Sequence, residues 1–127
     1  MIPLETNEQQ TVVQYLELKG LKFSAIPNST YTKSIKQKIK NRDEGLRSGL
    51  PDLLIVLPKK LLFIEMKREK GGVVSKFQQE WIDALNNINN SVEAVVCRGC
   101  DEAINKINLE LSYKFNNKEL LKPYKPK

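Results

Sequence analysis

The sequence contains no histidine and only two cysteines, Cys97 and Cys100. They stand in a Cys-Arg-Gly-Cys segment, which supplies half of a zinc site, and no histidine is present to complete it. A structural zinc site is therefore not expected. A redox pair is the alternative, but Cys97 ends an apolar run and buried cysteines are common, so we interpret both cysteines as structural.

Long apolar runs are also missing, and none approaches the roughly 20 residues that a membrane-spanning helix needs. Residues 1–5 have neither the basic start nor the apolar core of a signal peptide. With 40% hydrophobic and 28% charged residues, the composition is that of a globular protein. These absences exclude a membrane protein and predict a cytoplasmic location.

Acidic residues are outnumbered, since 15 Asp and Glu stand against 21 Lys and Arg. The formal charge of +6 and the isoelectric point near 9.3 suit a polyanionic partner, although many unrelated basic proteins share such values. The most basic stretch is 29–49, which has little apolar content. It predicts a solvent-facing segment with a short helix followed by a loop.

The first half of the chain alternates between helical and extended patterns. Apolar spacing predicts a helix over 4–19 and then a strand over 21–26. Continuous apolar runs at 52–57 and 61–64 predict two central strands joined by a tight turn. Residues 1–127 together suit a single domain.

The second half adds a long amphipathic helix, whose apolar residues run from Phe77 to Ile88 and whose expected cap is Ser75. A last strand over 92–97 and a helix capped by Asp101 follow. This order predicts a mixed sheet flanked by helices, an α/β fold. Residues 113–127 are expected to form a flexible or peripheral tail.

Two charged residues, Glu65 and Lys67, directly follow the apolar run 61–64. Buried strands rarely hold ions, because an unpaired charge taken out of water is costly. Since Glu65 and Lys67 are two positions apart, a strand points them to one face and Met66 to the other, packed face. The placement indicates a functional role for this pair.

A tight turn brings a second carboxylate to the same face. We expect a two-residue hairpin centred on Lys59 and Lys60, which places Asp52 opposite Lys67. Leu54 is then opposite Glu65, and the two carboxylates lie close enough to converge on one hard cation. Such a centre suits phosphodiester hydrolysis, because Mg²⁺ or Mn²⁺ lowers the pKa of bound water while Lys67 orients or deprotonates it.

The same residues have a simpler interpretation. Glu65 and Lys67 would form a surface salt bridge at a strand end, with Asp52 in a Pro-Asp turn. For such a pair taken alone this is the commoner arrangement, so the context has to decide.

The context resembles a known superfamily. Gly49-Leu50-Pro51-Asp52, followed by Glu65-Met66-Lys67 after an apolar strand, is similar to the core motif of the PD-(D/E)xK nucleases. More narrowly, the chain resembles the VRR-NUC family through segments that span nearly all of it: Ile26-Pro27-Asn28, Gly49 to Leu53, Phe63 to Gly72, Ser75 to Trp81, and Cys97-Arg98-Gly99 with Asp101-Glu102-Ala103.

The resemblance implies a restriction-endonuclease-like αβββαβ core and a magnesium or manganese site. It implies that Asp52 and Glu65 bind the metal with the main-chain carbonyl of Met66, that Lys67 acts on the water, and that Gln78 reaches the site from its helix. From the residues alone, Gln78 borders the apolar face of that helix, and an ordinary place on the helix surface is as good an interpretation.

The resemblance also implies a metal-binding glutamate on the first helix. A glutamate four residues before a glutamine selects Glu5 with Gln9, and Glu8 is the rival. Helical geometry favours Glu5, which shares a stripe with Gln9 and Leu16. Against it, Thr6 and Gln9 resemble a capping box that would start the helix after Glu5. We retain Glu5 as the expected ligand.

Stand-alone members of this length, often from phages or bacteria, resemble Holliday-junction resolvases that work as dimers. The resemblance therefore implies a homodimer that cuts four-way DNA junctions in the cytoplasm of a bacterial or phage-infected cell, since symmetric cutting needs two active sites. The expected DNA-binding residues, which would hold phosphates, are Lys36, Lys38, Arg47 and Arg68. A solvated basic loop is the alternative for the first three. No aromatic stacking platform is apparent.

Two other functions remain open. A flap-directed or general DNA endonuclease of the same fold would share the chemistry and differ only in the surrounding surfaces. A noncatalytic basic DNA-binding module would bind without metal-dependent cleavage.

Overall fold

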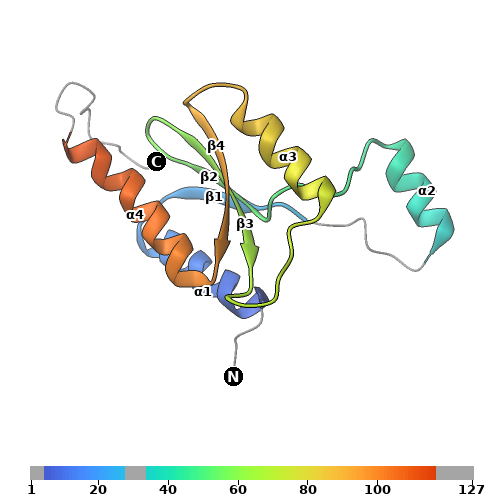
Figure 1. The fold of residues 1–127 in the computed structure, drawn as a ribbon, viewed down its shortest axis with the longest axis horizontal. Coiled ribbons are helices and arrows are strands. Elements are labelled where there is room, and N and C mark those ends of the chain that lie inside the picture. The colour runs from blue at the N-terminus through green and yellow to red at the C-terminus, as the bar shows by residue number, and fades with distance from the viewer. Residues whose placement is uncertain (1–4, 28–33, 117–127) are drawn as a thin grey trace.

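The computed structural model describes residues 5–27 and 34–116. Within these ranges the chain forms helices on either side of one sheet, as predicted for an α/β fold (Figure 1). The elements in chain order are α1 (Glu5–Leu18), β1 (Lys22–Ala25), α2 (Ile35–Asp43), β2 (Leu53–Val56), β3 (Leu61–Lys67), α3 (Lys76–Asn86), β4 (Val92–Arg98) and α4 (Cys100–Asn116).

The sheet has the strand order β1-β2-β3-β4. β1 pairs with β2, and β2 with β3, in antiparallel fashion, whereas β3 and β4 are parallel. A parallel pair needs a long crossover connection, and α3 supplies it. The sheet is therefore mixed, as the order of elements predicted.

The β2–β3 hairpin differs from the predicted register. Leu53 pairs with Ile64, and the turn is centred on Pro58 and Lys59, where Leu57 N–H donates to Lys60 O at 2.8 Å. Proline favours this turn position, because its fixed φ suits a turn and it has no N–H for the strand ladder. The predicted centre at Lys59–Lys60 was therefore wrong by one residue, which shifts the pairing by two positions.

The core lies between the sheet and the pair of helices α1 and α4. Alternate residues of the two central strands are fully buried on this face, Met66 among them, so its predicted inward direction is confirmed. The largest members of this core are Val12, Leu16, Leu53, Ile55, Leu62, Ile64, Met66 and Ile107. The intervening residues of β2 and β3, which include Glu65 and Lys67, belong to the opposite face.

Four predicted boundaries change by two residues or more. α3 ends at Asn86 and so leaves out Ile88, the last of the apolar residues predicted for this helix. β3 runs through Lys67, because its polar residues continue the pairing with β4. α4 begins at Cys100, so Asp101 lies in its first turn and is not its cap; the N–H of Cys100 is instead bound by the carboxylate of Glu8. α4 also continues to Asn116, so the first four residues of the expected tail 113–127 are helical, and residues 117–127 lie outside the described part.

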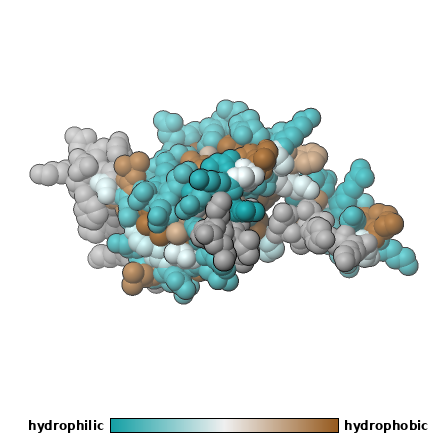
Figure 2. Space-filling view, turned by 60° about the horizontal axis from the view of Figure 1, so that its bottom comes forward, coloured by the Kyte–Doolittle hydropathy of each residue, from teal (hydrophilic) through white to brown (hydrophobic). Residues whose placement is uncertain are grey.

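α2 stands away from the rest of the structure (Figure 1) and buries none of its residues. Its position confirms that this part of the basic stretch 29–49 is solvent-facing. Figure 2 shows a hydrophobic patch at this end of the molecule, and Ile35 and Ile39 are the exposed apolar residues of α2. Among the described residues, no helix is both long and apolar enough to cross a bilayer.

Candidate active site

The predicted site residues meet where β2 starts and β3 ends. Continuing the observed register by one pair places Asp52 opposite Glu65 rather than opposite Lys67. Asp52 Oδ2 accepts a hydrogen bond from Met66 N–H at 2.7 Å, which holds this carboxylate against β3. A shift of two positions preserves the face of every side chain, so Asp52 still joins the face of Glu65.

Glu65 and Lys67 form a buried ion pair. Lys67 Nζ lies 3.5 Å from Glu65 Oε2, and the two residues are only 7% and 3% exposed. Burying two charges carries a large desolvation cost that a single contact repays poorly. The surface salt bridge considered from the sequence is therefore not what the structure contains. A buried pair at a strand end, beside a second carboxylate, is the arrangement expected of a site kept for chemistry.

Gln78 reaches this pair from α3. Its Nε2 donates to Glu65 Oε2 at 3.1 Å, while its Oε1 accepts from the Ser75 N–H at 2.9 Å. Ser75 caps α3 as predicted, and its Oγ in turn accepts from the Gln78 N–H, which completes a capping box. The helix cap therefore fixes the Gln78 amide with its donor group directed at Glu65.

The loop before Asp52 is packed against the start of α3. Gly49 has φ of 100°, and a Cβ at this position would lie 2.6 Å from the main-chain carbon of Phe77. Only glycine accepts this approach and this backbone conformation. Nearby, Trp81 Nε1 donates to Ser48 O at 3.0 Å. Sequence reasoning missed both contacts, although the Gly-Leu-Pro-Asp segment signals a constrained loop.

Of the two candidate glutamates on the first helix, the structure describes only the side chain of Glu8. Glu8, the rival candidate, is 5% exposed, and its carboxylate accepts from the N–H of Cys100 at the start of α4. Such a carboxylate stabilises a helix N-terminus. Glu5 lies in the first turn of α1, but its side chain is outside the described residues. Its role as a metal ligand stays a prediction.

The donor set fits a hard divalent cation. Asp52 and Glu65 supply carboxylates from facing positions, and the main-chain carbonyl of Met66 is the third expected donor. Among the described residues no group of three or more His, Cys, Asp and Glu side chains is arranged to hold a metal. Mg²⁺ does not require such a cage, because it keeps several waters and is held by one or two carboxylates together with substrate phosphate.

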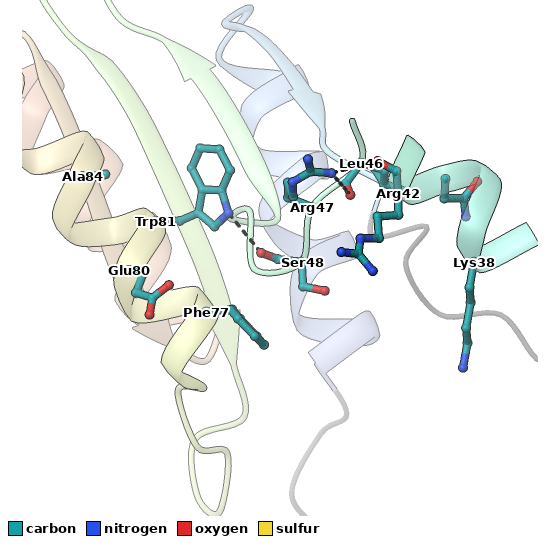
Figure 3. A pocket seen from close by; sticks show the side chains of 10 residues that line it. Lys38, Arg42, Leu46, Arg47, Ser48, Phe77, Glu80, Trp81 and Ala84 are labelled. Carbon is teal, nitrogen blue, oxygen red and sulfur yellow. Dashed lines mark hydrogen bonds between the residues drawn. The ribbon is translucent and has the colours of Figure 1, made fainter. Parts of the chain in front are cut away.

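A cleft of about 840 Å³ opens between α3 and α2 with its following loop (Figure 3). Two predicted DNA-binding residues, Lys38 and Arg47, line it; Lys36 and Arg68 are exposed elsewhere. Two aromatic residues of α3 also line it, a position that their helical spacing in the sequence did not predict. The full lining is Lys38, Asn41, Arg42, Leu46, Arg47, Ser48, Phe77, Glu80, Trp81 and Ala84.

The two cysteines are free thiols. Burial, aided by the charge of Glu102, raises the pKa of Cys97 to about 12. Burial and a hydrogen bond with Glu8 raise the pKa of Cys100 to about 11. Both thiols are therefore protonated at neutral pH and poorly nucleophilic, which agrees with the structural interpretation.

Comparison with known proteins agrees with this geometry. A family model described as the VRR-NUC domain matches residues 2–101. A solved structure described as a VRR_NUC domain protein has 27% sequence identity and a TM-score of 0.65, and the match covers 88% of this chain and 91% of that chain. No curated protein sequence matches the chain. The chain belongs to the VRR-NUC family, and is thereby a nuclease of the PD-(D/E)xK type.

Proposed function

We propose that the protein is a structure-selective DNA endonuclease whose catalytic residues are Asp52, Glu65, Lys67 and Gln78. Its membership of a nuclease family makes it a hydrolase that acts on DNA. The observation that supports these residues best is the buried Glu65 carboxylate, which Lys67 and Gln78 both contact on the face that Asp52 shares. Ionisable groups held this way mark functional sites.

Nucleases of this type are generally dependent on a divalent metal. We propose Mg²⁺ or Mn²⁺, held by Asp52, Glu65 and the carbonyl of Met66, with Glu5 as a further ligand from α1. When bound, the cation supplies positive charge beside the scissile phosphate. Each of the proposed side-chain and main-chain donors is an oxygen, which suits these ions better than zinc.

The chain's own groups have distinct roles in hydrolysis. Lys67 orients a water, or deprotonates it from the neutral amine form. The water oxygen forms the new bond to phosphorus as the bond from phosphorus to the leaving oxygen breaks, and the proton lost by the water reaches the leaving oxygen through solvent. Gln78 donates to Glu65 Oε2 and so keeps that carboxylate in position. Asp52 is oriented by the Met66 N–H. Because these partners are in place before DNA binds, little reorganisation accompanies the reaction.

The proposed substrate is a four-way DNA junction, cut by a homodimer in the cytoplasm of a bacterial or phage-infected cell. A junction has two equivalent strands to cut, and a two-fold dimer supplies one site for each. The net charge of +6 and the exposed cations Lys36, Lys38, Arg47 and Arg68 support phosphate contacts around the site.

The test compares cleavage of a labelled four-way junction, a flap and a linear duplex, with Mg²⁺, with Mn²⁺ and with a chelator. Symmetric nicks in the junction and a dimer in sedimentation equilibrium are expected. Asp52→Asn should abolish cutting, while Asp43→Asn, the same change at an exposed position on α2, should not.

Each other outcome has a clear meaning. Preference for the flap or the duplex, by a monomer, would overturn junction resolution and leave a general nuclease. Tight DNA binding without metal-dependent cutting would overturn the catalytic proposal and favour a binding module.

A further inference from the structure

The cleft between α2 and α3, here called the α2–α3 cleft, combines two features that the active site does not use. One wall is basic, with Lys38, Arg42 and Arg47; the other wall is aromatic, with Phe77 and Trp81 (Figure 3). Its volume of about 840 Å³ lies within the range of sites that hold small organic molecules. It therefore has room for a nucleotide.

The basic wall is arranged for phosphate. Arg47 Nη1 donates to the carbonyls of Arg42 and Leu46, at 3.0 and 3.1 Å, so its guanidinium is held at the wall while the residue remains exposed. Lys38 and Arg42 are exposed beside it. The one acidic residue in the described lining is Glu80, on the opposite wall. The charge of the cleft is therefore complementary to a polyanion.

The aromatic wall is arranged for stacking. Phe77 is 59% exposed, so its ring is open to a ligand in the cleft, although α3 packs its other side against β4. Phe77 and Trp81 are four residues apart, so they share one side of α3. The Trp81 ring is held by its bond to Ser48 O. A basic groove with exposed aromatic rings is the combination by which proteins bind single-stranded nucleic acid.

The cleft is connected to the candidate active site through α3. Phe77 adjoins Gln78 in sequence, and Gln78 contacts Glu65. Gly49, which precedes Asp52 by three residues, packs directly on the main chain of Phe77. A base held by Phe77 would thus lie beside the helix turn that contacts the metal-binding carboxylate.

We propose that the α2–α3 cleft binds an unpaired nucleotide of the DNA substrate, with its base stacked on Phe77 and its phosphates against Arg42 and Arg47. This inference rests on the proposed nuclease function, and it adds that one nucleotide of the junction next to the cleavage site is unpaired when the protein is bound. Stacking explains the exposed ring, and the two arginines explain the charge.

The test measures binding of labelled oligonucleotides by fluorescence anisotropy in a chelator, so that no strand is cut. The probes are a single-stranded oligothymidylate of about ten nucleotides, within the length that such clefts cover, an abasic strand of equal length, and a duplex. The wild type should prefer oligothymidylate to the abasic strand by about tenfold, the effect of one stacked base. Phe77→Leu should lose this preference, and Phe77→Trp should keep it.

Charge is tested separately. Arg42→Gln should weaken binding of both single strands and lower the slope of log affinity against log salt by about 0.7, the value for one phosphate contact. Lys40→Gln removes the same charge from the same helix outside the cleft lining and should leave the slope nearer to that of the wild type. The exposure of Phe77, Lys40 and Arg42 makes all these variants compatible with folding.

The outcomes separate the two proposals. Equal binding of oligothymidylate by wild type and Phe77→Leu, or no binding of it by the wild type, would overturn the cleft proposal, whatever the cleavage assay gives. Loss of base preference in Phe77→Leu supports the cleft proposal, even if Asp52→Asn proves to have no effect on cleavage and so overturns the proposed catalytic residues. The wild type and Phe77→Leu should bind the duplex equally, because a paired base cannot stack on Phe77.

Discussion

Gln78 has two tasks that one side chain performs together. Its Oε1 caps α3 through Ser75, and its Nε2 donates to Glu65. Gln78→Glu keeps the capping acceptor but replaces the donor with a carboxylate oxygen beside Glu65. We predict that DNA cleavage slows about a hundredfold, because repulsion displaces the Glu65 carboxylate and a misplacement of about 1 Å costs this much, as measured by single-turnover kinetics.

The control for this variant is Gln79→Glu. It introduces the same charge on the same helix turn, and it also breaks an amide-to-carboxylate bond, that with Asp83, but at the exposed surface. Its cleavage rate should remain close to that of the wild type. Equal rates for wild type and Gln78→Glu would remove Gln78 from the site.

Alanine variants of Gly49 and Gly45 can be compared to measure how much the close approach of the loop to α3 costs in stability. Both have positive φ, 100° and 98°, but a Cβ at Gly45 meets nothing within 4 Å. Gly45→Ala should cost about 1 kcal/mol in the free energy of unfolding, from backbone strain alone. Gly49→Ala should cost about 2 kcal/mol more, because its Cβ clashes with the Phe77 main chain. Urea denaturation measures both, and equal losses would contradict the clash.

At the level of individual residues, the sequence predicted much of the candidate site. Glu65 and Lys67 are conspicuous because charges seldom end an apolar strand, and the alternation rule gave their shared face. Phe77 and Trp81 were placed in the apolar stripe of an amphipathic helix, because helical spacing shows which residues share a side but not which part of the chain covers them. The structure places them against a loop far away in sequence, and only tertiary packing reveals the cleft.

Among the elements, the β2–β3 turn, β4 and α4 are joined by a network of four charges. Lys60 and Lys106 each contact Glu93 and Glu110, at distances of 2.6 to 3.1 Å. Burial alone would raise the pKa of Glu93, but hydrogen bonds from Lys106 and Lys60 outweigh it and leave that pKa lowered. Burial would likewise lower the pKa of both lysines, but Glu93 and Glu110 leave those values raised.

The network predicts how stability depends on pH. A lowered carboxyl pKa stabilises the fold above the ordinary value of 4.5, and this contribution is lost as pH falls through the folded-state value. The raised lysine values stabilise the fold below 10.5, and this contribution is lost as pH rises beyond it. Glu93→Gln should therefore lower the urea midpoint at pH 7 but not in strong acid. Glu17→Gln, at an exposed position, should leave the urea midpoint unchanged both at pH 7 and in strong acid.

The element boundaries show where sequence patterns are weak. The turn at Pro58 was misplaced because a pair of lysines looks as suitable for a turn as Pro-Lys, and only the observed pairing of Val56 with Leu61 decides. The start of α4 was misplaced because Asp101 is a good cap by type. The buried carboxylate of Glu8, 92 residues away, binds the N–H of Cys100, so the helix starts two residues earlier than a cap at Asp101 would allow. Local propensity cannot include such a partner.

For the whole molecule, α2 behaves as an arm that contributes charge without contributing to the core. Replacing Ile35–Asp43 by a Gly-Ser linker of equal length should shift the thermal midpoint by only about a few degrees, because α2 buries no residue. The same change removes the cations Lys36, Lys38, Lys40 and Arg42. The slope of log affinity for duplex DNA against log salt should fall in magnitude by about 2 to 4.

A second variant tests whether α2 affects DNA binding through its cations or through its exposed apolar residues. Ile35→Ser with Ile39→Ser removes the exposed apolar pair and keeps every cation of α2. It should retain the wild-type salt slope. A large drop in thermal midpoint for the linker variant would show instead that α2 supports the fold.

The double use of Gln78 limits which residue can occupy that position. The helix accepts glutamine or glutamate there, since both complete a capping box with Ser75. The buried Glu65 accepts only a donor, which rules out glutamate. Among the amino acids that satisfy the cap, glutamine alone satisfies the site. Selection for activity from a library randomised at position 78 should therefore return glutamine, whereas selection for folding alone should also return glutamate.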